Sequence, residues 1–384
     1  MSDWYDTELG NVCSFRAGAA FPTDFQGGTA GEYPFIKVSD LSSSGNELFI
    51  REANNWVTSE TAEELKAKPV RAGSVVFAKI GEGLKSERVR LTTMPTLLDN
   101  NLMAAIPGES LDPRFSLYLF ATVGLSSWAA GSALPYLRQG DLARIPIRLP
   151  HLDEQRRIAE VLGALDDLID TNERLAADAA ELRRSLLDAA FALATEQHAL
   201  SSIARFVNGK NFTKGADGAG RPIIRTPEVR EGVKPSTVRS SVEATDDFIA
   251  RAGDLLFVWS GSLCIGRWAE DEALVNQHVF KVTPNVGVPD WYVYACLEWK
   301  LPWFLGLAAD KATTMGHIQR AHLDAPVPKL SSDELAHLDA SVRPLWELEL
   351  ELSRENEQLR RTRDELLPLL MSGAVRVRPQ GVAA

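Results

Sequence analysis

Apolar residues recur at every seventh position in two long segments that are otherwise rich in charged side chains. The first row is Val161, Leu168, Leu175 and Leu182, and the second is Leu338, Leu345, Leu352, Leu359 and Leu366. A seven-residue apolar repeat kept over several heptads is typical of a helix that buries one stripe against another helix. Two such segments in one chain predict two long helices that pack on each other.

A second heptad row accompanies each apolar row and contains an asparagine at a matching place. Asn172 starts the sequence Asn-Glu-Arg-Leu in the first segment, and Asn356 starts Asn-Glu-Gln-Leu in the second. A buried asparagine can fix the register of a coiled coil, so we expect these two residues to do so here. The residues expected to pack in the helix pair or against a partner are Ile158, Leu165, Leu168, Asn172, Leu175, Leu182, Leu345, Leu352, Asn356, Leu359 and Leu366.

The segments that precede the two helices resemble each other. Three matches occur in the same order: Leu9, Gly18 and Phe21 recur as Leu200, Gly209 and Phe212; Gly73-Ser-Val-Val-Phe-Ala recurs as Gly253-Asp-Leu-Leu-Phe-Val; and Leu97-Leu-Asp-Asn-Asn-Leu-Met recurs as Leu274-Val-Asn-Gln-His-Val-Phe. Short β-type runs bounded by glycine and polar clusters predict strands in both segments. The repeated order of motifs predicts an internal duplication.

These patterns predict an α+β fold with tandem duplicated, mixed α/β domains separated by two long antiparallel coiled-coil helices. The first helix leaves the first domain and enters the second, so the second helix must run back along it. The expected boundaries are 1–152 for the first domain, 153–195 for the first helix, 196–330 for the second domain, 331–373 for the second helix and 374–384 for a tail.

The composition is that of a globular protein with more than one core. The chain has 384 residues, of which 45% are hydrophobic and 24% charged. No stretch approaches about 18 consecutive apolar residues, which argues against a transmembrane helix, and the acidic start Met-Ser-Asp-Trp-Tyr-Asp does not fit a secretory signal. Cys13, Cys264 and Cys296 are too few for a disulfide framework or a zinc site. We expect a cytoplasmic protein that makes no contact with a membrane.

The sequence contains none of the catalytic motifs that we searched for. It has neither the glycine-rich loop nor the Asn/Asp-Pro-Pro-aromatic motif of a methyltransferase, and no Walker A, His-Glu-x-x-His or serine nucleophile motif. Gly81-Glu-Gly83 is interpreted as a hairpin turn, and Glu64-Leu-Lys66 as the surface of a capped helix. We therefore expect no catalytic residue, cofactor or metal ion in this chain.

Charge is distributed unevenly along the chain. The net charge is −11. Residues 151–200 hold 5 basic and 11 acidic side chains, whereas residues 201–330 hold 15 and 14. Because phosphate binding needs a basic surface, this composition argues against tight DNA binding by the chain alone. The near-neutral domains can still carry local basic faces.

Side chains suited to nucleic-acid contacts gather at matching places in the two domains. Arg, Lys, Asn and Gln contact base edges and phosphates. The alternative interpretation is an ordinary solvated hairpin surface. The candidates are Lys79, Lys85, Arg88, Arg90, Arg138, Gln139, Trp259, Ser260, Arg267, Asn276, Gln277, His278, Gln319 and Arg320.

The helix junctions carry a resemblance to a known family. Ile145-Pro-Ile-Arg-Leu-Pro-His-Leu-Asp-Glu-Gln-Arg-Arg-Ile158 and Leu366-Leu-Pro-Leu-Leu-Met-Ser-Gly373 are similar to the specificity subunit of type I restriction–modification systems. The resemblance implies two target recognition domains, each reading half of a bipartite double-stranded DNA sequence, and two helices that fix their spacing. It also implies that two methyltransferase (modification) subunits dock on the helices and that motor–nuclease restriction subunits join them. S-adenosylmethionine, Mg²⁺ and ATP would belong to those partners.

The second copy departs from this pattern. Its junction, Pro326-Val-Pro-Lys-Leu-Ser-Ser-Asp-Glu-Leu, lacks the Glu-Gln pair of the first junction. Two other functions stay open: the specificity subunit of a methylation-only or fused methylase–nuclease system, and a tandem-domain scaffold that binds protein rather than DNA. Specific retention of duplex DNA by the chain together with a methyltransferase partner would separate DNA recognition from the scaffold.

Overall fold

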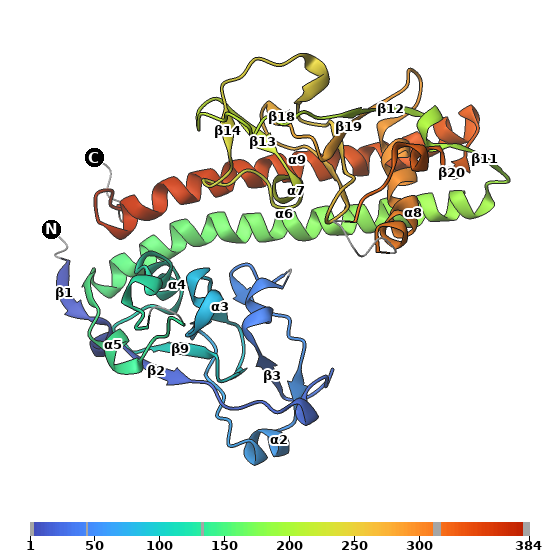
Figure 1. Ribbon diagram of the computed structural model, residues 1–384. Coiled ribbons are helices and arrows are strands. Elements are labelled where there is room, and N and C mark those ends of the chain that lie inside the picture. The colour runs from blue at the N-terminus through green and yellow to red at the C-terminus, as the bar shows by residue number, and fades with distance from the viewer. Residues whose placement is uncertain (1–3, 44, 132–133, 310–315, 379–384) are drawn as a thin grey trace. The chain divides into compact units, whose positions relative to one another are not determined.

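The computed structural model describes residues 4–43, 45–131, 134–309 and 316–378 of the chain (Figure 1). The chain forms two compact units. The first unit consists of residues 1–167 and 361–384, and the second of residues 168–360. Residues 379–384 of the expected tail lie outside the described residues.

The described part of the first unit is built on three sheets. A five-stranded sheet has the order β2-β9-β6-β7-β4, a three-stranded sheet has the order β5-β3-β8, and β1 pairs with β10. The strands are β1 (Tyr5–Glu8), β2 (Cys13–Ala17), β3 (Tyr33–Ile36), β4 (Phe49–Ile50), β5 (Trp56–Val57), β6 (Val75–Ala78), β7 (Val89–Thr92), β8 (Leu97–Leu98), β9 (Leu102–Pro107) and β10 (Pro146–Leu149). Its shorter helices are α1 (Leu9–Val12), α2 (Ser59–Glu64), α3 (Gly81–Lys85), α4 (Pro113–Thr122) and α5 (Gln139–Ala143).

Helix α4 packs on the large sheet of this unit. The carboxylate of Asp112 caps the helix by accepting a hydrogen bond from the N–H of Phe115 at 2.9 Å, and Pro113 occupies the first turn. The ring of Phe120 stacks on Phe77 of β6 with centroids 5.7 Å apart. Both rings are almost fully buried, so α4 and β6 form the centre of the core.

The long helix α6 (Leu152–Leu193) is joined to this core by Gln155. The buried amide of Gln155 donates to the carbonyl oxygens of Ser110 and Pro150, both at 2.9 Å, and its Oε1 accepts from the N–H of Asp112 at 2.9 Å. One side chain thus satisfies three backbone groups where two helices begin. These bonds explain the glutamine of the Glu-Gln pair in the first junction.

The second unit repeats this architecture. The sheet β12-β19-β16-β17 matches β2-β9-β6-β7, and the parallel pair β13–β18 matches the parallel pair β3–β8. The strands are β11 (Glu196–Ala199), β12 (Ala204–Asn208), β13 (Arg221–Ile224), β14 (Arg239–Ser240), β15 (Ile249–Ala250), β16 (Leu255–Val258), β17 (Cys264–Arg267), β18 (Ala273–Val275), β19 (Val279–Pro284) and β20 (Pro326–Lys329). The helices are α7 (Thr226–Glu231), α8 (Asp290–Ala309) and the short 3₁₀ helix η6 (Arg320–Asp324). The α+β fold with duplicated sheet domains and two long helices is therefore confirmed.

A tyrosine satisfies the second junction, which lacks the Glu-Gln pair. The hydroxyl of Tyr292 in α8 donates to the carbonyl of Pro328 at 2.6 Å and accepts from the N–H of Leu330 at 3.3 Å. Tyr292 is buried. A side chain from α8 rather than from the long helix therefore bonds the backbone at the second junction.

Helices α6 and α9 (Ser332–Met371) pack on each other and run antiparallel. In the second unit, the side chain of Asn356 donates to the carbonyl of Ile169 at 3.2 Å, and Arg183, further along α6, bonds Glu349 at 2.7 Å. As residue numbers rise along α6, those of its partners on α9 fall, which fixes the direction (Figure 1). Asn172 is also buried, and its Nδ2 donates to Glu355 at 2.9 Å.

The leucine row of the first helix does not lie in the seam, which is the contact surface between α6 and α9. Leu168, Leu175 and Leu182 are 41%, 45% and 52% exposed. The buried stripe of α6 instead includes polar residues such as Asn172 and Arg183, whose polar groups are paired across the seam. The expectation that this row packs on the second helix is wrong. The heptad pattern was found by looking for apolar residues, and such a pattern does not show contact positions that are filled by paired polar side chains.

The interpretation of Gly81-Glu-Gly83 as a hairpin turn is also wrong. These residues open helix α3. A Cβ at Gly83 would lie 2.7 Å from Cγ1 of Val38 and 3.1 Å from Cβ of Ala78. Glycine is therefore needed because the helix approaches its neighbours closely.

Candidate nucleic-acid interface

Three candidate residues of the first unit lie where β6 ends. The N–H of Lys79 donates to the carbonyl of Asn101 at 2.9 Å, and the carbonyl of Lys79 accepts from the N–H of Leu137 at 2.8 Å. Arg138 and Gln139 follow directly, at the start of α5. These backbone bonds bring segments that are far apart in sequence to one edge of the unit.

Arg138 is exposed and is oriented by Tyr136. Its guanidinium carbon lies 5.1 Å from the centroid of the tyrosine ring, and its Nη2 donates to the tyrosine hydroxyl. Tyr136 is held in turn by backbone bonds in both directions with Ala130, each 2.9 Å long. Within the described ranges, no carboxylate forms an ion pair with Arg138. The guanidinium therefore keeps donors available for a ligand.

Lys85 and Arg88 have side-chain partners of their own. Lys85, at the end of α3, forms an ion pair with Glu82. The Nη1 of Arg88 donates to the hydroxyl of Ser42 at 2.8 Å. Both side chains are exposed, so they remain available for phosphate contacts.

Arg90 is not part of an exposed loop, although it is one of the candidates for nucleic-acid contacts. It lies on β7, where its Nη1 donates to the carbonyl of Val89 at 2.8 Å. Burial, with repulsion from Arg88, lowers the pKa of Arg90 to about 10. The strand turns this side chain inward, and helix α3 separates it in sequence from Lys79.

The second unit uses the same backbone bonds to place Trp259. The N–H of Trp259 donates to the carbonyl of His278 at 3.2 Å, and its carbonyl accepts from the N–H of Ile318 at 3.1 Å. Gln319 and Arg320 follow at the start of η6, and both are exposed. The same backbone hydrogen bonds and the same order of elements recur in the two units, and we call this the duplicated frame. It makes four pairs of positions equivalent: 79 and 259, 101 and 278, 138 and 319, and 139 and 320.

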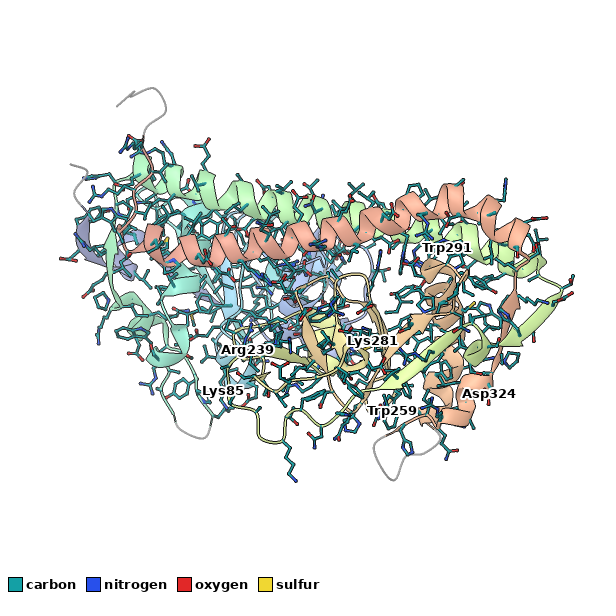
Figure 2. All side chains as sticks on the ribbon, turned by 90° about the horizontal axis from the view of Figure 1, so that it is seen from above. Lys85, Arg239, Trp259, Lys281, Trp291 and Asp324 are labelled. Carbon is teal, nitrogen blue, oxygen red and sulfur yellow. The ribbon has the colours of Figure 1, made fainter. Side chains whose placement is uncertain are left out.

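Trp259 is the centre of an aromatic cluster on the side of the second unit that faces away from α9 (Figure 2). Its ring centroid lies 5.7 Å from that of His278 and 6.4 Å from that of His317. Its Nε1 donates to Oδ1 of Asn208 at 2.7 Å, and the adjacent Ser260 forms a β-bridge with His317. The second unit thus carries aromatic rings where the first carries a lysine.

The turn at residues 276–278 holds polar atoms without internal partners. Asn276 is 6% exposed, and its Oδ1, like Nδ1 of His278, has no hydrogen-bond partner within the described ranges. Nε2 of Gln277 lies 3.3 Å from Nε2 of His278. Buried polar atoms are normally paired, so this turn has unused capacity for a ligand.

A glycine fixes the backbone beside this turn. A Cβ at Gly209 would lie 2.2 Å from the carbonyl oxygen of Val275 and 2.3 Å from that of Asn276. In the first unit, a Cβ at Gly18 would lie 2.0 Å from the carbonyl oxygen of Asp99. The repeated glycine is therefore explained by the same close crossing of two chain segments in each unit.

Arg267 does not belong to the interface, which corrects its selection as a DNA-binding candidate. It lies on β17 and donates to the carbonyl of Trp346 in α9, with its guanidinium carbon 4.0 Å from the tryptophan ring centroid. Burial lowers the pKa of Arg267. Packed against α9, it fastens the sheet of the second unit to that helix.

Sequence reasoning missed two residues that shape the interface, Tyr136 and Asn208. Tyr136 lies two positions before Arg138 in extended chain, a spacing that places both side chains on one face. That spacing was the available signal. The bond from Trp259 to Asn208 joins residues 51 positions apart and has no local signal.

The exposed row Leu168, Leu175 and Leu182 forms an apolar stripe on α6 within the second unit. Residues seven apart lie on one face of a helix after about two turns. Regularly spaced exposed leucines on a long helix are typical of a surface that a partner covers.

The described residues hold neither a metal-binding cluster nor a membrane-spanning helix. They contain no group of three or more His, Cys, Asp or Glu side chains arranged to hold a metal ion. Across the same ranges, no helix has the length and apolar character needed to cross a membrane. Cys13, Cys264 and Cys296 are free thiols.

Comparison with known proteins gives a consistent result. The sequence model of the family described as the type I restriction modification DNA specificity domain matches residues 1–179. The specificity subunit of the type I restriction enzyme MjaIX of Methanocaldococcus jannaschii is 23% identical over 98% of this chain and 94% of its own length. The MjaVIII specificity subunit of the same organism is 25% identical over 45% of this chain and 41% of its own.

A solved structure has the same fold. The crystal structure of the S subunit of a type I restriction–modification system from M. genitalium matches with a TM-score of 0.59, covering 98% of this chain and 97% of that one at 12% identity. The matched domain, the nearly full-length alignment to a specificity subunit and the shared fold agree with the junction sequences. Residues 1–179 therefore match the type I restriction modification DNA specificity domain, and nearly the whole chain is similar to specificity subunits of type I restriction–modification systems.

Proposed function

We propose that this chain is the DNA-recognition subunit of a type I restriction–modification complex and that each unit reads one half of a bipartite duplex target. The observation that carries the proposal is the duplicated frame, in which equivalent backbone positions bear different side chains. Positions 79 and 259 hold lysine and tryptophan, and positions 138 and 319 hold arginine and glutamine. A shared frame with different contact residues suits two readers of different sequences.

The side chains at these positions suit base reading. Arginine and glutamine make bidentate hydrogen bonds to base edges, each worth about 1–3 kcal/mol of discrimination. A few such contacts in each half-site are sufficient for specific recognition. As a specificity subunit, the chain is the non-catalytic component, and in this proposal S-adenosylmethionine, Mg²⁺ and ATP act in its partners in the cytoplasm.

The proposed partners are two modification subunits, joined in a restriction-competent complex by motor–nuclease subunits. The exposed leucines of α6 support a docking surface for a partner helix. The acidic composition of residues 151–200 also suits a basic partner surface. Partners that add basic surface would offset the net charge of −11, which opposes DNA binding by the chain alone.

Exchange of one recognition unit tests the proposal. Residues 1–152 are replaced by the matching segment of a relative with a different target, and the variant is co-expressed with its modification subunits. Methylation mapping of the host genome is expected to show a change in one half of the target only. Exchange of residues 196–330 is the matched control and should change the other half.

Two results would contradict the proposal. A change in both halves after a single exchange would mean that the units do not read separately. Failure of the assembled complex to retain any specific duplex would favour a protein-binding scaffold.

A further inference from the structure

Arg138 and Gln319 occupy the same place in the duplicated frame. Each directly follows a residue whose N–H bonds the chain at the end of the equivalent strand, β6 in the first unit and β16 in the second. Each directly precedes a short helix, α5 or η6. Both residues are exposed. A side chain at this position is held on a fixed backbone and presented to a ligand.

Arg138 differs from the other basic candidates of its unit because an aromatic ring and a hydroxyl together orient its guanidinium without neutralising its charge. Lys85 is paired with Glu82, Arg90 is half-buried on β7, and Arg88 is oriented by one hydroxyl, that of Ser42. Arg138 instead contacts the ring and hydroxyl of Tyr136, and within the described ranges it forms no ion pair with a carboxylate. The planar guanidinium of Arg138 therefore keeps its positive charge and is exposed to solvent.

An oriented guanidinium fits one base better than the others. Guanine presents two acceptors, O6 and N7, in the major groove, and the planar fork of arginine matches both. The side-chain amide of glutamine matches the donor and acceptor of adenine, N6 and N7, in the same way. The arginine fork also matches a phosphate, but lysine can bind a phosphate as a point charge and cannot reproduce the bidentate pairing with guanine.

We propose that position 138 and its equivalent 319 are specificity-determining positions, at which Arg138 reads a guanine in the first half-site and Gln319 reads an adenine in the second. The inference rests on the proposed function, since it requires that the two units read DNA. Tyr136 acts as a positioning residue, because it orients the guanidinium without being needed at the base.

Methylation mapping of the complete complex with its modification subunits tests the assignment. Arg138→Gln should lose the preference for a G·C pair at one position of the first half-site, with about 5-fold to 150-fold less discrimination, the range expected for one bidentate contact. The second half-site should stay unchanged. Gln319→Arg should convert one A·T position of the second half-site to G·C and leave the first half intact.

Two conservative variants separate base reading from simple charge. Arg138→Lys keeps the charge but lacks the planar fork, so it should lose the same discrimination. Tyr136→Phe keeps Arg138 and removes the hydroxyl that orients it, so discrimination at the same base pair should fall and the other positions should be unaffected. Arg148→Gln, which changes an exposed arginine on β10, is the matched control and should keep the wild-type target.

A binding measurement covers the case in which Arg138→Gln methylates too weakly to be mapped. The probe is a duplex carrying the wild-type target with 7-deazaguanine, which lacks the N7 acceptor, in place of the guanine. This substitution should weaken binding of the wild-type complex and leave binding of the Arg138→Gln complex unchanged.

Several results would overturn the assignment. They are a first half-site without a G·C pair, undiminished methylation of the original site by Arg138→Gln, full discrimination by Arg138→Lys, and equal loss of binding to the 7-deazaguanine duplex by both complexes. None of these alters the expected result of the unit exchange. If exchange of residues 1–152 also leaves both half-sites unchanged, the proposed function itself fails.

Discussion

Arg183 is a charged residue in a position where a packed helix normally carries an apolar one. It is 1% exposed and bonds Glu349 of α9 at 2.7 Å and Glu298 of α8 at 2.8 Å. Its guanidinium carbon also lies 5.2 Å from the ring of Trp346. Although burial disfavours its charge, the hydrogen bonds that it donates to the two carboxylates raise the pKa of Arg183 above the ordinary value. Arg183 therefore stays charged and joins three helices of the second unit.

Replacing Arg183 by methionine should strongly destabilise the second unit. The change leaves Glu298 and Glu349 without their cation, and breaking a buried pair costs about 3–5 kcal/mol. Because these carboxylates are 26% and 18% exposed, we expect about 3 kcal/mol. Chemical denaturation measures the loss, and Arg184→Met, at the exposed neighbouring position, is the control. Equal midpoints for the two variants would contradict this role.

Single residues differ in how far sequence could predict them. The polar breaks at Asn172 and Asn356 are visible in the repeats, and both residues are buried. Arg267 and Arg138 were both selected because arginine suits nucleic-acid contacts, yet Arg267 packs on α9. Only the fold distinguishes them, because a strand sends alternate side chains to opposite faces and the sequence does not say which face is covered.

At the scale of elements, local patterns predicted the long helices and most strand runs, because these depend on periodicity and turn residues. The same patterns failed to assign Leu168, Leu175 and Leu182, which lie beside the buried seam. A heptad pattern identifies residues that share one face of a helix. It does not show which other part of the protein or which partner covers that face. An apolar row left exposed within one chain indicates a surface covered by another.

The leucine row should be needed for assembly and dispensable for stability. Leu175→Glu places a charge at the centre of the exposed stripe, so the partner would have to bury an unpaired carboxylate. We expect at least a 10-fold weaker association with the modification subunit and an unchanged unfolding midpoint. Co-purification and titration measure the association.

Ala177→Glu serves as the control for this prediction. It adds the same charge at an exposed position of α6, two residues further along and therefore on a different face. Assembly of Leu175→Glu at wild-type affinity would exclude the stripe as the docking surface.

At the scale of the whole molecule, the duplication could be predicted because its motifs keep their order. The differences between the two copies could not be predicted in the same way. Gln155 and Tyr292 satisfy the backbone at equivalent junctions although they share no sequence signal. The second junction lacks the Glu-Gln pair, and Tyr292 bonds its backbone through groups different from those that Gln155 bonds in the first.

The two long helices each pass from one compact unit into the other. α6 crosses between Asp167 and Leu168, and α9 crosses between Arg360 and Arg361. The bonds described across the seam lie within single units, such as that of Asn356 to the carbonyl of Ile169 in the second. Insertions at the two crossings would therefore lengthen the helices without breaking these bonds.

One heptad inserted at both crossings should change the gap in the DNA target. Seven residues add about 10 Å to each helix, which corresponds to roughly three base pairs at 3.4 Å each. Three base pairs also rotate the far half-site by about 100° around the duplex. Methylation mapping should therefore show loss of the original gap, with a longer gap accepted or no bipartite site methylated well. An insertion in α6 alone should instead disrupt the helix pairing and lower stability. If the doubly lengthened chain methylates the original site undiminished, the helices do not set the gap, and spacing must come from the partner subunits.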